Sequence, residues 1–114
     1  MRFALRTMLL FILILTATAC VSNVNLTEGI RSFQAQDYRR AFVRLIPEAK
    51  KGQPDAQYAV GYMYYYGQGV IEDRKVAWYW INRAADAGQP EAKVAAEILR
   101  RQAKLILYKQ GKHI

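Results

Sequence analysis

The sequence repeats itself after 36 residues. Shifted by 36 positions, the segment Gly52-Gln53-Pro54-Asp55-Ala56 falls on Gly88-Gln89-Pro90-Glu91-Ala92. Further pairs in the same register are Asp37 with Asp73, Arg39 with Lys75, Ala41 with Ala77, Phe42 with Trp78, Leu45 with Ile81, Ala49 with Ala85 and Ala59 with Ala95. A period of this length, with small residues and Gly-x-Pro at fixed offsets, is typical of stacked helical repeats. The chain is therefore predicted to be all-α, a short solenoid of helix-turn-helix units.

The first 19 residues have the plan of a secretory signal. A short basic start with Arg2 and Arg6 precedes an unbroken apolar run from Met8 to Leu15, and small residues follow it. This order of basic, apolar and small residues marks an export signal. The apolar run is short of the roughly 20 residues that span a bilayer. We therefore predict a signal peptide at residues 1–19; an uncleaved membrane anchor is the alternative.

Cys20 follows this signal directly and is the single cysteine of the chain. Its position resembles the lipobox of bacterial lipoproteins, in which the thiol carries diacylglycerol and the chain is cut just before it. Ala17 stands where that motif usually has Leu, and Ala17-Thr18-Ala19 also suits ordinary signal peptidase. Cys20 is expected to be lipidated, and a free N-terminal thiol is the alternative. Val21 resembles the residue found after the cysteine in lipoproteins that pass to the outer membrane.

Charge is concentrated toward the C-terminal end. Without residues 1–19, the chain keeps 15 Lys and Arg against 9 Asp and Glu. From residue 93 onward there are six cations, Lys93, Arg100, Arg101, Lys104, Lys109 and Lys112, against the single acid Glu97. Arg100, Arg101 and Lys104 are therefore candidate contacts to an anionic surface, with a solvated helix face as the alternative. Nucleic acid is not expected as a partner of an exported chain.

Helical periodicity predicts where the units begin and end. We expect a polar tether at residues 20–26 and helices at about 27–36, 38–51, 55–66, 74–87 and 92–109. Asp37 and Asp73 are suited to cap the second and fourth helices, and Pro47 is expected to kink or restart the second. The last helix is expected to bury Ala95, Leu99, Ala103 and Ile106 as one stripe.

Residues 56–92 resemble the Sel1-like repeat, a relative of the tetratricopeptide repeat. The positions that carry the resemblance are Ala56, Gly61, Tyr64, Gly67, Gly69, Val70, Asp73, Ala77, Trp80, Ala84, Ala85, Gly88 and Ala92. The resemblance implies a repeat domain at 27–112, with a half repeat at 37–55, a full repeat at 56–91 and a capping helix at 92–109. It also implies structural roles: Gly61 lets a neighbouring helix pass close, and Trp80 fills the space between paired helices.

The sequence offers no set of residues for catalysis or metal binding. His113 is the single histidine, and the segment after Cys20 holds two serines, Ser22 and Ser32. No Ser-x-x-Lys pattern, Gly-rich phosphate loop or metal-ligand spacing is present. We therefore expect no enzyme activity, no metal and no cofactor.

One face of the third helix points to binding. Tyr58, Tyr62 and Tyr65 recur at i, i+4 and i+7, opposite the predicted core face. Tyrosine is favoured at contact surfaces because it combines a broad rigid ring with a hydroxyl group. We expect this row to contact a partner; packing against neighbouring helices is the alternative.

These observations predict a non-enzymatic adaptor that binds an envelope protein or peptide. We expect an exported lipoprotein that faces the periplasm and is anchored through Cys20, most simply in the outer membrane. Two alternatives follow from other features. Some cysteine-rich Sel1-like proteins bind or weakly hydrolyse β-lactams, although their paired cysteines are absent here. The basic C-terminal helix could instead bind anionic lipid or a cell-wall polymer.

Overall fold

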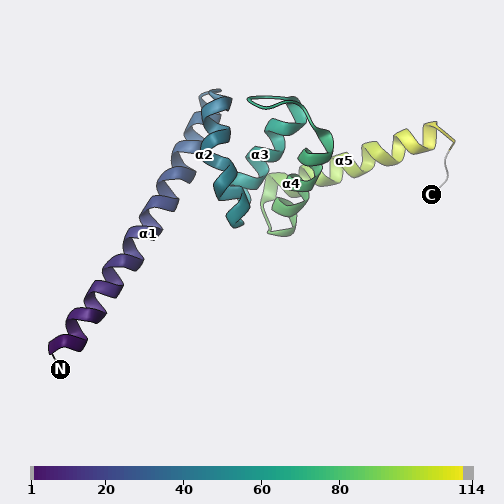
Figure 1. Cartoon of the computed structure of the whole chain (residues 1–114). Coiled ribbons are helices and arrows are strands. Elements are labelled where there is room, and N and C mark those ends of the chain that lie inside the picture. Colours follow the sequence, from purple (N-terminus) through teal and green to yellow (C-terminus); the bar gives the residue numbers. More distant parts are fainter. Residues whose placement is uncertain (1, 112–114) are drawn as a thin grey trace.

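The computed structural model describes the backbone of residues 2–111 and the side chains of residues 2–12 and 24–111. Its helices are α1 (Arg2–Gln34), α2 (Tyr38–Lys51), α3 (Pro54–Tyr66), α4 (Arg74–Asp86) and α5 (Pro90–Lys109). Successive helices pack as antiparallel neighbours, and α1 and α5 extend from opposite ends of the stack (Figure 1). The predicted all-α solenoid is confirmed.

Local signals set most helix ends. The Asp37 carboxylate accepts from the backbone N–H of Arg40, and the Asp73 carboxylate accepts from those of Lys75 and Val76, so both predicted N-caps are confirmed. Pro54 and Pro90 lie in the first turns of α3 and α5, where the missing N–H costs nothing. Helix α2 runs through Pro47 to Lys51 without restarting.

The start of the domain differs from the prediction. The helix expected from Thr27 is the end of α1, which begins at Arg2. The expected tether is helical at residues 24–26. There the Asn25 Oδ1 atom accepts from Arg44 Nη1 at 2.9 Å, and Leu26 packs against the core. These contacts with α2 explain why the helix continues into this segment. Signal cleavage stays a prediction.

The core lies between α2, α3 and α4 and consists mainly of small residues. Its buried cluster contains Ala41, Leu45, Ala49, Ala56, Ala59, Val60, Met63 and Trp80. The expected role of Gly61 is confirmed: a Cβ atom there would lie 2.8 Å from Ile81 Cγ1 and 3.2 Å from the Ala77 carbonyl oxygen. Trp80 is buried in this cluster, as expected. The core is therefore stabilised by close packing of the helices more than by large side chains.

The loop from Gly67 to Asp73 folds back onto the start of α2. Gly69 has φ +73°, and a Cβ atom there would lie 2.6 Å from the Tyr38 carbonyl carbon. Only glycine combines this left-handed backbone with so close an approach. The loop therefore fastens the second helix pair to the first.

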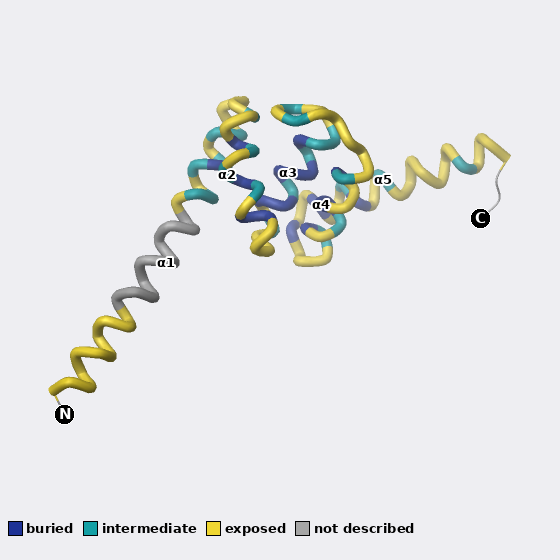
Figure 2. The backbone as a smooth tube through the Cα atoms, in the orientation of Figure 1, coloured by how far each residue is buried: buried dark blue, intermediate teal, exposed yellow. Residues whose placement is uncertain are grey.

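The predicted buried stripe of α5 is wrong in its second half. Ala92 and Ala96 are the buried residues of this helix, and Ala95 and Leu99 are half-buried. Ala103 and Ile106 are exposed, because α5 continues past α4 and the described residues place nothing over its last turns (Figure 2). We call residues 103–111 the α5 overhang. Among the described residues, no helix has the length and sustained hydropathy that a membrane span requires.

Candidate functional site

A groove of about 190 Å³ lies between α3 and α5. Tyr58, Tyr62 and Tyr65, the row predicted from the sequence, form its α3 wall and are each half-buried. The opposite wall comes from α5, and Ile81 of α4 also lines the groove. The α5 residues are Ala95, Ile98, Leu99 and Gln102. The tyrosine row thus has a facing apolar wall instead of standing on an open helix surface.

Tyr66 completes the aromatic wall and was missed by sequence reasoning. Its ring centroid lies 4.7 Å from that of Tyr62 and 4.9 Å from that of Tyr65, and the residue is 57% exposed. The i, i+4 spacing of Tyr62 and Tyr66 is a signal that could have found it. Ile98, which is 49% exposed, was missed because the sequence assigned neighbouring Ala95 and Leu99 to the core.

Tyr62 also has a structural role. Its ring meets Phe33 of α1 edge-on, with centroids 5.4 Å apart. Phe33 in turn meets Tyr38 at 5.6 Å. The middle of the row therefore joins α3 to the first helix pair, while Tyr58, Tyr65 and Tyr66 have no such aromatic contact with α1 or α2 among the described residues.

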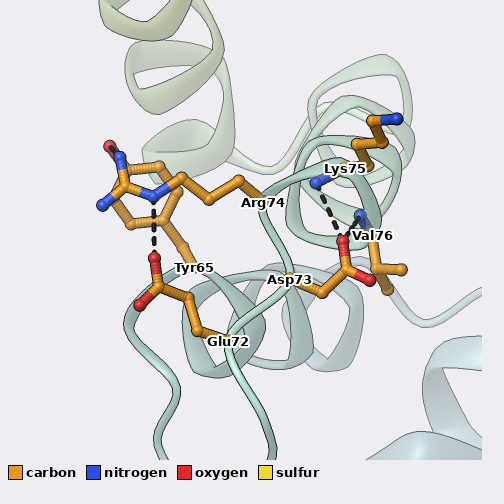
Figure 3. Close-up of polar contacts among 6 residues, drawn as sticks. All are labelled: Tyr65, Glu72, Asp73, Arg74, Lys75 and Val76. Atoms are coloured by element: carbon orange, nitrogen blue, oxygen red, sulfur yellow. Dashed lines mark hydrogen bonds and ion pairs between the residues drawn. The ribbon is translucent and has the colours of Figure 1, made fainter.

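Arg74 holds one end of the row. Its guanidinium carbon lies 4.3 Å from the Tyr65 ring centroid, and Nη1 donates to the Tyr65 hydroxyl at 3.1 Å. Its Nε donates to Glu72 at 3.0 Å (Figure 3). Because Asp73 fixes the first turn of α4, the base of the Arg74 side chain is fixed as well. The Tyr65 end of the groove is therefore a pre-ordered cationic end.

A second, more open hollow of about 390 Å³ adjoins this cationic end. It shares Tyr65, Leu99 and Gln102 with the first groove. The remaining lining residues are Arg74, Lys75, Trp78, Ala103 and Ile106. The two hollows form one surface along α5 that becomes more basic away from Tyr58.

The other end of the row is acidic. Gln89 Nε2 donates to Glu91 at 2.6 Å and to Asp55 at 3.4 Å, so both carboxylates meet at one amide. Burial, followed by the nearby Glu91 carboxylate, raises the pKa of Tyr58 above its usual value. Like other tyrosines, Tyr58 is protonated at neutral pH and can donate a hydrogen bond. Carboxylates therefore lie next to the Tyr58 end of the groove, and Arg74, which is already paired with Glu72, lies next to the Tyr65 end together with Lys75.

The other predicted site residues lie away from this groove. Arg100, Arg101 and Lys104 are exposed on α5. Glu97 accepts from Arg101 Nε at 3.0 Å and lies 3.5 Å from Arg100 Nη1. The hydrogen bond from Arg101 lowers the pKa of Glu97. The Cys20 side chain and His113 lie outside the described residues.

A wider depression of about 570 Å³ on α1 and α2 is less suited to a ligand. It is lined by Asn25, Asp37, Arg39, Arg40, Val43, Arg44 and Pro47. Of its three arginines, Arg44 is bound to Asn25 at 2.9 Å and to Glu28 at 3.4 Å. Its lining holds no aromatic ring, so it offers less rigid contact area than the tyrosine groove.

Comparison with known proteins agrees with the repeat pattern. The family model described as Sel1 repeat matches residues 54–89. This range contains α3, the loop that follows it and α4, two residues ahead of the predicted repeat 56–91 at each end. Neither a search of curated proteins nor a search of solved structures gives a match.

Proposed function

We propose that this chain, whose residues 54–89 form a Sel1 repeat, is a tethered adaptor that holds a peptide segment of an envelope protein in its tyrosine groove. The Sel1 repeat is a protein-interaction repeat, so binding of another protein is the function at the coarsest level. The finer assignment rests on one observation. Four tyrosines of α3 face an apolar wall of α5 and leave an open groove between them. The proposed function includes no catalytic step.

The chemistry of the groove supports a binding role. Aromatic side chains provide large contact area at low cost in conformational entropy, and their hydroxyl groups supply hydrogen bonds. The rings are also held in place by one another and by Arg74. Binding to such a pre-ordered surface loses less entropy than binding to a mobile one.

The charges at the two ends favour one orientation of the bound segment. Asp55 and Glu91 lie beside Tyr58, and Arg74 lies beside Tyr65. These tyrosines are seven positions apart in the helix, which corresponds to about 10 Å along α3. The segment that fits best is apolar, with a cationic group at the Tyr58 end and an acidic group at the Tyr65 end.

Site-specific crosslinking in intact cells tests this proposal. A photoreactive residue in place of Ile98, on the α5 wall, is expected to capture one partner that mass spectrometry can identify. The matched control replaces Val43, which is 65% exposed on α2 and outside the groove. Capture of the same protein from both positions would contradict a groove-specific contact.

Loss of two groove tyrosines should remove that capture. Tyr58→Ala with Tyr66→Ala is expected to weaken binding at least about tenfold, because interface tyrosines often contribute more than 1 kcal/mol each. Tyr62 is left in place because its ring packs on Phe33. Circular dichroism should show unchanged helicity. Retained capture by the double variant would exclude the groove as the binding site.

The lipoprotein assignment has its own test. Cys20→Ser is expected to move the chain from the membrane fraction to the soluble periplasmic fraction, or to block processing at the signal. Intact-mass measurement of the wild-type chain should show a diacylglycerol-modified N-terminus at residue 20. An unmodified Cys20 with unchanged fractionation would exclude lipid attachment through this thiol.

A further inference from the structure

The α5 overhang exposes apolar side chains that the fold does not cover. Leu105, Ile106 and Tyr108 are 60%, 56% and 74% exposed. Between Ala103 and Gly111 only Leu107 is half-buried, and all the other residues are exposed. Figures 1 and 2 show this segment extending from the body as a single exposed helix. Helical turns without tertiary contacts open easily, so this end of α5 would be stabilised by a surface that covers it.

The charge near these apolar side chains is almost entirely positive. Arg100, Arg101, Lys104 and Lys109 lie on or just before the overhang, and all four are exposed. Glu97 pairs with Arg100 and Arg101, whereas Lys104 and Lys109 form no ion pair among the described residues. A second copy of this helix would bring the same positive charges together, which is unfavourable.

We propose that the α5 overhang binds an anionic lipid bilayer as an interfacial helix. Apolar side chains on one side, with lysine and arginine around them, are the pattern of helices that lie in the headgroup region. Leu105 and Tyr108, three residues apart, share a face that would enter the interface. Arg101 lies on this same face one turn earlier, and Arg100 and Lys104 lie on its flank, so these cations would meet the lipid phosphates.

This surface is separate from the other apolar end of the molecule. Phe3, Leu5 and Met8 of α1 are also exposed, but they lie at the far end of a molecule that is 76 Å long (Figure 1). The overhang is also outside the groove formed by the tyrosines, apart from Ile106 and Ala103 at the edge of the second hollow. A measurement confined to residues 103–111 therefore distinguishes a lipid contact of the overhang from contacts of the α1 end or of the tyrosine groove.

Hydrogen exchange by mass spectrometry provides that readout. The full chain is measured free, with neutral phosphatidylcholine vesicles, and with vesicles containing 30% phosphatidylglycerol. We expect fast exchange at residues 103–111 in the free chain and slow exchange with the anionic vesicles only. Raising the salt to about 0.5 M should remove the protection, because it shortens the screening length.

Variants separate the charged from the apolar contribution. Arg100→Gln with Lys104→Gln should lower the docking constant about 30-fold, since each cation near an anionic surface contributes about fivefold. Lys50→Gln with Lys93→Gln removes the same charge from exposed sites outside the overhang and should have a much smaller effect. Leu105→Gln with Tyr108→Gln should abolish protection even at low salt.

Three outcomes would overturn the proposal. Equal protection by neutral and anionic vesicles would remove the role of charge. No protection by either vesicle would exclude a lipid surface. Protection in the free chain that rises with protein concentration would instead identify a second copy as the cover of the overhang.

Discussion

At the residue scale, Gly61 controls how closely α3 and α4 approach. An added Cβ atom would lie 2.8 Å from Ile81 Cγ1, 3.1 Å from the Ile81 backbone nitrogen and 3.2 Å from the Ala77 carbonyl oxygen. Because two of these three atoms belong to the backbone, a helix must move to accommodate the methyl group. Gly61→Ala should therefore destabilise the fold by about 1–3 kcal/mol, even after the gain in helix propensity. Thermal unfolding followed by circular dichroism measures this change.

Gly29 allows a second test of close helix approach. A Cβ atom there would lie 2.6 Å from Leu45 Cδ2 and Cγ, and Leu45 is fully buried in the core. Because the packed core leaves Leu45 little room to move, Gly29→Ala should also destabilise the fold. Unchanged stability of Gly61→Ala would show that helix spacing is not what Gly61 protects.

At the scale of elements, the first helix pair follows a different register from the second. The loop between α1 and α2 has three residues, and the loop between α3 and α4 has seven. Helix α1 therefore aligns with α3 at a shift of 32 residues, whereas α2 aligns with α4 at a shift of 36. Leu26, Ile30 and Phe33 then correspond to Tyr58, Tyr62 and Tyr65. The positions that carry the groove tyrosines on α3 thus carry apolar residues on α1, and these pack against the core.

Phe33 should accordingly contribute to stability in a way that the outer tyrosines do not. It is half-buried and meets both Tyr38 and Tyr62 edge-on. Phe33→Ala is expected to cost about 2 kcal/mol, roughly half the loss at a fully buried site. Denaturant unfolding measures this, and limited proteolysis should show faster cleavage within residues 24–34. Tyr66→Ala is the control and should change stability little, because Tyr66 is 57% exposed.

The elements that could be predicted from the sequence are those that depend on local signals or on the repeat pattern. The caps at Asp37 and Asp73 depend on local signals, whereas the close contact at Gly61 was implied by the repeat resemblance; the structure has all three as predicted. The helical segment at 24–26 depends on partners on α2, which no local pattern specifies. Tyr66 was recognisable by spacing, but its role needed the α5 wall to be known.

At the scale of the whole molecule, cohesion is concentrated in the middle of the stack. The buried cluster draws on α2, α3 and α4, and α5 adds only Ala92 and Ala96 to the buried residues described. In a solenoid each unit is stabilised by its neighbours, so turns that pass beyond the last neighbour gain little. The apolar period of α5 continued past Gln102, which is why its sequence predicted burial where the structure has none.

A chain that ends after Gln102 tests this distribution. It lacks residues 103–114 but keeps all the buried residues described, so its melting temperature should stay within about 2 °C of the full chain. Its helical ellipticity should fall only by the contribution of the missing turns. A chain that ends after Glu91 is the control; it loses Ala92 and Ala96 and uncovers the α3–α4 surface, so it should melt well below both. A large loss on ending at Gln102 would mean that the overhang packs against the body in solution. It would then be unable to lie on a lipid surface without first leaving that contact.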